Sequence, residues 1–296
     1  MTKARVSAHL IVGRREEPFL GALLESLAGV VDFVIVNDNG PEPSAHGAIL
    51  NESWHGRNGR LIVDTSPFVD FSTARNRCLE VHAKEDGGDW VAFVDADEVH
   101  GTHVAAIAAN LANVPATYDF VDGYTWHFFQ SFDLYASIER RMAFFRYTPA
   151  VRWTGKVHEQ LTGLSGKRLA LPYVYGHYGH VLPARWHAEK GRQYSSLGQS
   201  GPIVGEGSLD SIDVAEYFKE FWPIVMRFTG HHPAAARPTI QRLRADYADA
   251  QRRAMALARA AQPPLQRARN LLMKANYEQR WRSRALNPFA RRIMSA

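Results

Sequence analysis

The chain has 296 residues, of which 46% are apolar and 22% charged, a composition that excludes disordered, collagen-like and disulfide-stapled proteins. It holds one cysteine, has no signal-peptide pattern after Met1 and has no apolar run near the roughly 18 residues that span a bilayer, so we expect a cytoplasmic protein. Its formal charge of +5 divides into +7 on residues 265–296 and −2 on the rest, which makes nucleic acid an unlikely partner of the body.

The first 120 residues alternate strand and helix signals. Short apolar runs with β-branched residues predict strands at 6–12, 30–36, 61–63 and 90–94. Helical spacing predicts helices at 19–27, 72–83 and 103–111, the second of them opened by a Ser or Thr cap. This order predicts an α/β fold with a parallel sheet and helices on its faces.

The middle of the chain is rich in aromatic and β-branched residues. Residues 118–146 predict further strands of the same sheet. Segments 155–161 and 173–181 hold most of the histidines that could carry chemistry. The glycines of 198–208 predict a loop or domain boundary.

The sequence pattern of the last third of the chain predicts helices. One helix is expected over 239–261, with Pro238 at its start, and Pro263-Pro264 ends it before a second, basic helix. We therefore predict an α/β domain over 1–204 and a helical C-terminal extension over 205–296.

The basic tail at 265–296 has three interpretations: a solvated or partner-binding helix, a peripheral anchor at the inner face of the membrane, or a nucleic-acid contact. Its eight cations are Arg267, Arg269, Lys274, Arg280, Arg282, Arg284, Arg291 and Arg292, with the single acid Glu278. The apolar residues that could meet lipid beside them are Leu271, Leu272, Met273, Trp281, Leu286, Phe289 and Ile293.

An Asp-x-Asp pair follows the strand predicted at 90–94. In open α/β sheets ligands bind beyond the carboxyl ends of strands, which is where Asp95 and Asp97 would lie. Two such carboxylates can share a divalent cation whose shell a diphosphate completes. The alternative is a polar strand exit with a helix cap.

Two further polar residues would lie near this edge. Asp38 ends the second predicted strand, where the alternative is an Asx-turn residue. Arg75 lies near the start of the 72–83 helix, where its donors could reach a diphosphate. The alternative for Arg75 is a surface ion pair with a nearby acid.

Six short motifs occur in order along the chain. They are Ile-Val-x-x-x-Glu-Glu at 11–17, Val-x-Asp-x-Gly at 36–40, Ala-Arg-Asn at 74–76, Asp-Ala-Asp-Glu at 95–98, Gly-Lys-Val-His-Glu at 155–159 and His-Tyr-Gly at 177–179. Together they resemble family 2 glycosyltransferases of the GT-A fold. The two later motifs resemble a bacterial branch that includes lipopolysaccharide-core glucosyltransferases and peptide S-glycosyltransferases.

The resemblance implies inverting transfer of a sugar from a nucleotide-sugar, most often UDP-linked, with Mn²⁺ or Mg²⁺ as cofactor. It implies donor binding by Glu17, Asp38, Arg75 and Asp95, with Asp38 at the base, and metal binding by Asp97. The metal would neutralise the departing nucleoside diphosphate.

Inverting transfer needs a base that takes the acceptor proton. We predict Glu159 for this role because it follows His158 in a segment that would face the acceptor. Asp133 is a weaker choice. The alternative for Glu159 is a structural ion pair with an arginine, for which the chain offers Arg140, Arg141, Arg146 and Arg152.

Other residues that could serve the site are histidines and tryptophans. We predict His177 as a third metal ligand, since neutral imidazole suits Mn²⁺. His158 and His180 are expected to be structural or to lie near the acceptor. Trp153 could stack on a sugar ring, although a place in the core is the ordinary role of a tryptophan. Cys78 is expected to be a buried, inert thiol.

The predicted function is thus glycosyl transfer to an acceptor that the sequence does not identify: a glycan, a lipid-linked glycan, a peptide or a small molecule. Two alternatives remain. One is a metal-dependent hydrolase built on the Asp and His residues, although the chain lacks a His-Glu-x-x-His signature. The other is a non-catalytic nucleotide-binding module.

Overall fold

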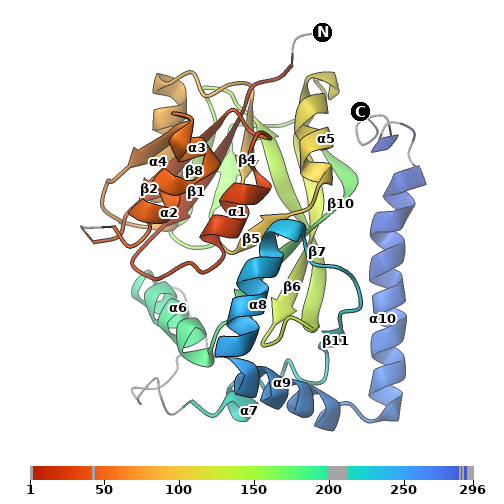
Figure 1. Cartoon of the computed structure of the whole chain (residues 1–296). Helices are drawn as coiled ribbons and strands as arrows, with labels where there is room; N and C mark the ends of the chain where they lie inside the picture. The colour runs from red at the N-terminus through yellow and green to blue at the C-terminus, as the bar shows by residue number, and fades with distance from the viewer. Residues whose placement is uncertain (1–2, 42–43, 199–211, 287, 289, 292–296) are drawn as a thin grey trace.

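A computed structural model describes residues 3–41, 44–198, 212–286, 288 and 290–291. Its centre is a nine-stranded sheet in the order β3-β2-β1-β4-β7-β6-β10-β5, with β11 paired to β7 (Figure 1). The strands are β1 (Val6–Val12), β2 (Phe33–Asp38), β3 (Leu61–Asp64), β4 (Trp90–Phe93), β5 (Glu98–His100), β6 (Tyr118–Phe129), β7 (Leu134–Arg146), β10 (Lys167–His180) and β11 (Met226–Arg227). Strands β8 (Arg152–Thr154) and β9 (Gln160–Thr162) form a separate hairpin.

Helices flank this sheet and follow it, so the predicted α/β class with C-terminal helices is confirmed. They are α1 (Leu20–Ser26), α2 (Gly47–Glu52), α3 (Trp54–Arg57), α4 (Phe71–Lys84), α5 (His103–Asn110), α6 (Ala184–Ser196), α7 (Val214–Tyr217), α8 (Arg237–Asp246), α9 (Ala248–Ala260) and α10 (Pro264–Arg282). Short 3₁₀ turns lie at Leu111–Asn113, Ala234–Ala236 and Ser283–Leu286.

Strands β1 to β4 form the predicted parallel half of the sheet. The strand expected at 6–12 is β1 without change. Strand β2 runs two residues past the expected end, because Asn37 and Asp38 still pair with Ile11 and Val12. The acids that follow the predicted strands therefore lie at one edge of the sheet.

Both faces of this half are covered. Alternate residues of β1, from Val6 to Val12, pack in one core cluster with leucines of α1 and with Ile107 of α5. On the other face, Ser7 and His9 contact His82 of α4. Because side chains alternate along a strand, α1 and α5 cover one face of the sheet and α4 the other.

Helix α4 begins at a different cap from the one predicted. The expected Ser or Thr cap is wrong: Asp70 precedes the helix, and its Oδ1 accepts a hydrogen bond from the Thr73 amide at 2.7 Å. A carboxylate at this position satisfies an orphan amide and also faces the positive end of the helix dipole. Cys78, on the same helix, is fully buried as predicted, and burial raises its pKa to about 11.

The strands predicted within 118–146 are β6 and β7, and both belong to the main sheet as expected. Strand β7 pairs antiparallel with β4 and with β6, and β6 pairs parallel with β10. Strand β10 pairs in turn with the short β5, where His177 lies opposite Glu98. Through this pairing, the end of β10 lies beside Asp95 and Asp97, which follow β4.

The C-terminal helices share a core with the sheet. Met226 and Ile240 lie in one buried cluster with Phe19 and Tyr124, and β11 pairs with β7. The boundary predicted at 204 falls in 199–211, outside the described residues. The single helix expected over 239–261 is two helices, because Tyr247 leaves helical geometry (φ −117°, ψ 29°) and packs against that buried cluster.

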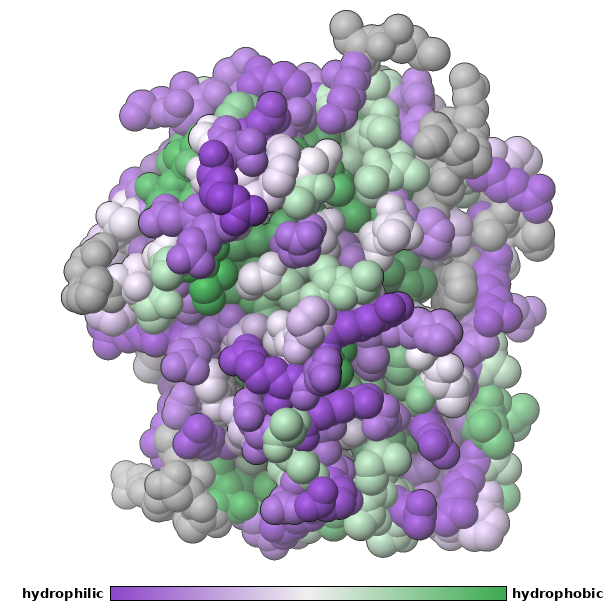
Figure 2. Space-filling view, in the orientation of Figure 1, coloured by the Kyte–Doolittle hydropathy of each residue, from purple (hydrophilic) through white to green (hydrophobic). Residues whose placement is uncertain are grey.

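Helix α10 is the predicted second basic helix, and it begins at Pro264. Its side chains Leu265, Leu271 and Leu272 are 67–84% exposed. Figure 2 shows apolar side chains on its lower part among hydrophilic neighbours. Among the described residues, no helix combines the length and the apolarity that a bilayer span requires.

Candidate active site

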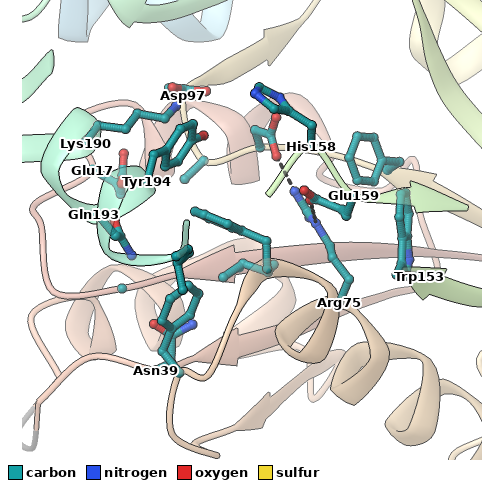
Figure 3. A pocket seen from close by; sticks show the side chains of 18 of the residues that line it. Glu17, Asn39, Arg75, Asp97, Trp153, His158, Glu159, Lys190, Gln193 and Tyr194 are labelled. Atoms are coloured by element: carbon teal, nitrogen blue, oxygen red, sulfur yellow. Dashed lines mark hydrogen bonds and ion pairs between the residues drawn. The ribbon is translucent and has the colours of Figure 1, made fainter. Parts of the chain in front are cut away.

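A cavity of about 1490 Å³ opens at the carboxyl ends of β1 to β4. It is lined by residues that follow each of these strands, among them Gly13, Asn39, Thr65 and Asp95. Helix α6 supplies another wall, and Figure 3 shows its Lys190, Gln193 and Tyr194 across the cavity from Arg75 and Glu159. The cavity thus lies where ligands bind in open α/β sheets.

The fold brings nearly all of the predicted site residues to this one cavity. Those that line it are Glu17, Arg75, Asp95, Asp97, Trp153, His158, Glu159, His177 and His180. Asp38 is the exception: it is 4% exposed, does not line the cavity, and accepts hydrogen bonds from the Gly40 amide and the Ser44 hydroxyl. The Gly40 contact is that of the Asx-turn alternative.

Arg75 lies at the centre of a buried ion network. Its Nη2 donates to Asp95, its Nε donates to Glu159 Oε1 at 3.3 Å, and its Nη1 donates to the Val94 carbonyl at 3.2 Å. The side chain is only 5% exposed and its guanidinium lies 4.4 Å from the centroid of the Phe93 ring. Arg75 therefore fixes Asp95 and Glu159 relative to each other.

The rest of the Ala-Arg-Asn motif holds the segment that carries Glu159. Asn76 donates to the Trp153 carbonyl and accepts from the Trp153 amide, both at 2.9 Å. The Phe71 amide donates to the Lys156 carbonyl at 3.2 Å. The start of α4 thus attaches the β8–β9 turn to the sheet, which the sequence alone did not indicate.

Asp97 lies against the end of β10. Its carbonyl accepts from the Tyr178 amide at 2.8 Å, and its Oδ1 lies 3.4 Å from His177 Nε2. A Cβ at Gly179 would collide with the Asp97 carboxylate. Glycine in the His-Tyr-Gly motif therefore leaves the space that this carboxylate occupies.

The two carboxylates of the Asp-x-Asp pair have opposite electrostatic environments. Burial opposes ionisation of Asp95, but Arg75 and Arg141 outweigh it and hold the pKa of Asp95 below its usual value. Burial raises the pKa of Asp97, and Asp95 adds to this shift while Lys190 opposes it. Asp97 is thus the carboxylate whose negative charge is poorly compensated.

Two further titratable groups share this part of the cavity. Burial raises the pKa of Glu17 to about 7, with a further contribution from the charge of Asp97. Burial and the neighbouring His127 lower the pKa of His177 well below its usual value. His177 is therefore a neutral imidazole at pH 7, which is the form that binds metal ions.

The residues around Asp97 fit a divalent cation. Asp97 Oδ1 and His177 Nδ1 are buried and make no hydrogen bond in the described part of the chain. Buried polar atoms are nearly always hydrogen-bonded, so two such atoms on neighbouring side chains are unusual. Carboxylate oxygen and imidazole nitrogen are both ligands for Mn²⁺, and Asp97 and His177 would hold the ion.

The remaining predicted residues lie around the same cavity. Trp153 is 5% exposed and stacks on Phe93, so the core role of a tryptophan accounts for most of its surface. His158 adopts a left-handed backbone (φ 54°) beside Tyr194. His180 Nδ1 lies 3.3 Å from His187 Nδ1. Asp133 pairs instead with Arg244 at 2.7 Å and does not line the cavity.

Sequence reasoning missed residues that reach the cavity from distant segments. Arg141 of β7 contacts Asp95 at 3.4 Å and Glu98 at 3.1 Å. His127 of β6 lies beside His177, and Lys190 comes from α6. No local motif marks these positions, because each depends on the pairing or packing of elements far apart in the chain.

No protein-family model matches the chain, and no curated protein does either. Solved structures that resemble it include the mannosyltransferase PcManGT from Pyrobaculum calidifontis in complex with GDP-Man and Mn²⁺, which is 15% identical over 99% of this chain and 84% of that one, with a TM-score of 0.42. GalNAc-T7 with UDP, GalNAc and Mn²⁺ is 12% identical over 73% of this chain and 54% of that one, with a TM-score of 0.39.

A third similar structure is a mycobacterial protein, 20% identical, with a TM-score of 0.29. The match covers 41% of each chain, so this protein aligns with less than half of that one's length. These likenesses concern the fold alone, and the donors and the metal belong to the proteins that were solved with them.

Proposed function

We propose that the protein is an inverting, divalent-metal-dependent glycosyltransferase that moves a sugar from a nucleotide-sugar, with UDP as the expected nucleotide, to an acceptor. The observation that carries this proposal is the cavity at the carboxyl ends of β1 to β4, where Asp97 presents a poorly compensated carboxylate beside His177. A cavity of about 1490 Å³ has room for a nucleotide-sugar and part of an acceptor.

The donor's diphosphate would lie near Asp97. A divalent ion held by Asp97 and His177 supplies positive charge for the departing diphosphate. Lys190 of α6 and Arg15 after β1 also line the cavity, and both act electrostatically on Asp97. Their side chains would bind diphosphate oxygens, with Lys190 as a point charge and Arg15 through its planar fork of donors.

Glu159 is the proposed base that takes the acceptor proton. Arg75 acts as a positioning residue, because its contacts to Asp95 and Glu159 set the distance between the donor side and the acceptor side. Glu17 is a second carboxylate at the cavity, and its pKa of about 7 also suits a base. Glu159→Gln and Glu17→Gln therefore form a matched pair, of which Glu159→Gln is expected to lose roughly 10²–10⁴-fold in turnover.

The test is a screen of UDP- and GDP-sugars with Mn²⁺, read by release of nucleoside diphosphate. We expect hydrolysis or transfer of one donor, and its loss in Asp97→Asn. Asp70→Asn is the matched control, because Asp70 caps α4 outside the cavity and Asn is an equally good cap. No turnover of any donor, together with no binding of UDP, would refute the proposal.

A metal-dependent hydrolase is the second candidate, since three imidazoles, those of His127, His177 and His180, gather at this cavity. Isothermal titration with UDP in the presence of Mn²⁺ separates the two functions. A glycosyltransferase binds UDP, whereas a hydrolase of another substrate class has no reason to do so.

A further inference from the structure

Three histidines meet at the Asp97 end of the cavity. A ring nitrogen of each of His127, His177 and His180 lies within 4.8 Å of those of the other two. The ring centroids of His127 and His177 are 4.8 Å apart, and those of His177 and His180 are 5.2 Å apart. Within the glycosyltransferase interpretation of the sequence, only His177 was expected at a metal.

The sheet itself places these rings together. Strands β6 and β10 are parallel neighbours, and their register sets His127 directly opposite His177. In a regular strand His177 and His180 would point to opposite faces, because side chains alternate. The register shifts between them, and this irregularity brings both rings to the cavity side.

The outer two histidines are each oriented by a neighbour. His127 Nε2 lies 3.5 Å from Glu139 Oε2, and His180 Nδ1 lies 3.3 Å from His187 Nδ1. In each ring the other nitrogen would be the one offered to the ion. A ligand histidine that contacts a carboxylate or another polar group through its second nitrogen is the usual arrangement in metal sites.

We propose that His127 and His180 join Asp97 and His177 in holding one divalent ion, and that this nitrogen-rich set selects a transition metal over Mg²⁺. The inference deepens the proposed function, because the ion would be the one that serves the donor's diphosphate. Mg²⁺ prefers oxygen ligands in a strict octahedron, whereas imidazole suits Zn²⁺ best, and Mn²⁺ accepts it more readily than Mg²⁺ does.

The present geometry needs only a small adjustment to bind an ion. Ligand nitrogens that share one tetrahedral ion with bonds of about 2.0–2.1 Å lie about 3.3 Å apart. One ligand nitrogen of each histidine lies within 4.8 Å of the other two, so side-chain rotations would bring the three together, and Asp97, which lies outside this group, would move toward it. Asp97 Oδ1 already lies 3.4 Å from His177 Nε2.

The test measures metal binding by the full chain, stripped with EDTA, without any sugar. Titration calorimetry with Zn²⁺, Mn²⁺ and Mg²⁺ is expected to give affinities in that order, with Mn²⁺ at least about 10-fold tighter than Mg²⁺. His127→Asn and His180→Asn should each lower Mn²⁺ affinity roughly 10–100-fold and reduce its advantage over Mg²⁺.

His103→Asn is the matched control, because His103 is an exposed histidine at the start of α5 and does not line the cavity. It should leave all three affinities unchanged. Visible absorption of the Co²⁺-loaded protein gives a second readout: the ligand-field bands should change in the His127 and His180 variants and persist in the control. His→Gln variants replace any Asn variant that does not fold.

Equal affinity for Mn²⁺ and Mg²⁺, or unchanged Mn²⁺ binding in both histidine variants, would overturn the inference. The proposed function fails separately. Selective metal binding through the histidines without turnover of any nucleotide-sugar supports this site and refutes sugar transfer. Turnover that is indifferent to His127 and His180 refutes this site alone.

Discussion

Asp95 and Asp97 are two residues apart, yet they lie in two different chemical regions of one cavity. Asp95 belongs to an ion network with Arg75 and Arg141, in which every acid contacts a guanidinium. Asp97 faces imidazoles, and one of its oxygens is buried without a hydrogen bond among the described residues. We call these the arginine region and the histidine region.

Within the Asp-x-Asp motif, the contacts of Asp95 thus support the fold, whereas Asp97 would hold the proposed ion. The arginine region is internally neutralised, so its charges hold the β4 exit, α4 and the β8–β9 turn together. The histidine region keeps a poorly compensated carboxylate, which costs stability unless a cation binds. A strained or unpaired group that persists in a fold is a mark of a functional site.

The largest effect is expected in the arginine region. Arg75→Met removes one guanidinium from both Asp95 and Glu159 and leaves Asp95 with Arg141 alone, and removal of one partner from a buried ion pair costs about 3–5 kcal/mol. Urea unfolding measures this loss. Arg77→Met is the control on the same helix, because Arg77 is exposed and solvent screens its pair with Glu80, so its loss should change stability little. Equal losses in both variants would contradict the buried network.

The next effect concerns turnover in the histidine region. Asp97→Asn removes the charge that would hold the ion, and nucleotide-sugar turnover should fall on the order of 10²–10³-fold. Folding should not suffer, because the carboxylate lacks compensation. Asp70→Asn should keep full turnover. A variant at Asp97 that retains wild-type turnover would leave the histidine region without a catalytic role.

A smaller effect is expected on the free energy of unfolding without metal, whose pH dependence distinguishes the two carboxylates. The pKa of Asp95 is lowered on folding, so its charge adds stability above pH 4, and this contribution is lost as the pH falls through the folded pKa. The pKa of Asp97 is raised on folding, so its ionisation removes stability as the pH rises above 4.

Asp95→Asn should therefore destabilise the protein at pH 7 by about 1–3 kcal/mol. Asp97→Asn should stabilise it there by roughly 0.5–2 kcal/mol. Both differences should shrink toward pH 4. Urea unfolding in EDTA at several pH values measures these differences. If both variants changed the free energy of unfolding in the same direction, the distinction between the two regions would be contradicted.

The smallest effect on folding is expected outside both regions, on α10. Leu271→Ser with Leu272→Ser should change the free energy of unfolding by no more than about 0.5 kcal/mol, since both side chains are largely exposed. If these leucines meet lipid beside the basic residues, sedimentation with anionic vesicles should fall severalfold in the double variant. Unchanged sedimentation would leave the tail as a solvated or partner-binding helix.

Local patterns were enough to predict β1, β2, β4 and α4, but they did not predict β8, β9, β10 or α6, which also line the site. Strand β1 and the acids after β4 follow from short-range signals: an apolar run, then polar residues at its carboxyl end. The helix break at Tyr247 did not follow, because that ring leaves the helix to join a core made by distant residues.

The sequence by itself determined the α/β order, the strand exits and nine of the residues that line the cavity, since these depend on neighbours in the chain. Only the tertiary structure decided their partners. Arg75 binds Glu159, whereas the ion-pair alternative for Glu159 named four other arginines, and His127 meets His177 through the β6–β10 register. Strand pairing joins residues 50 positions apart, and no local pattern encodes that alignment.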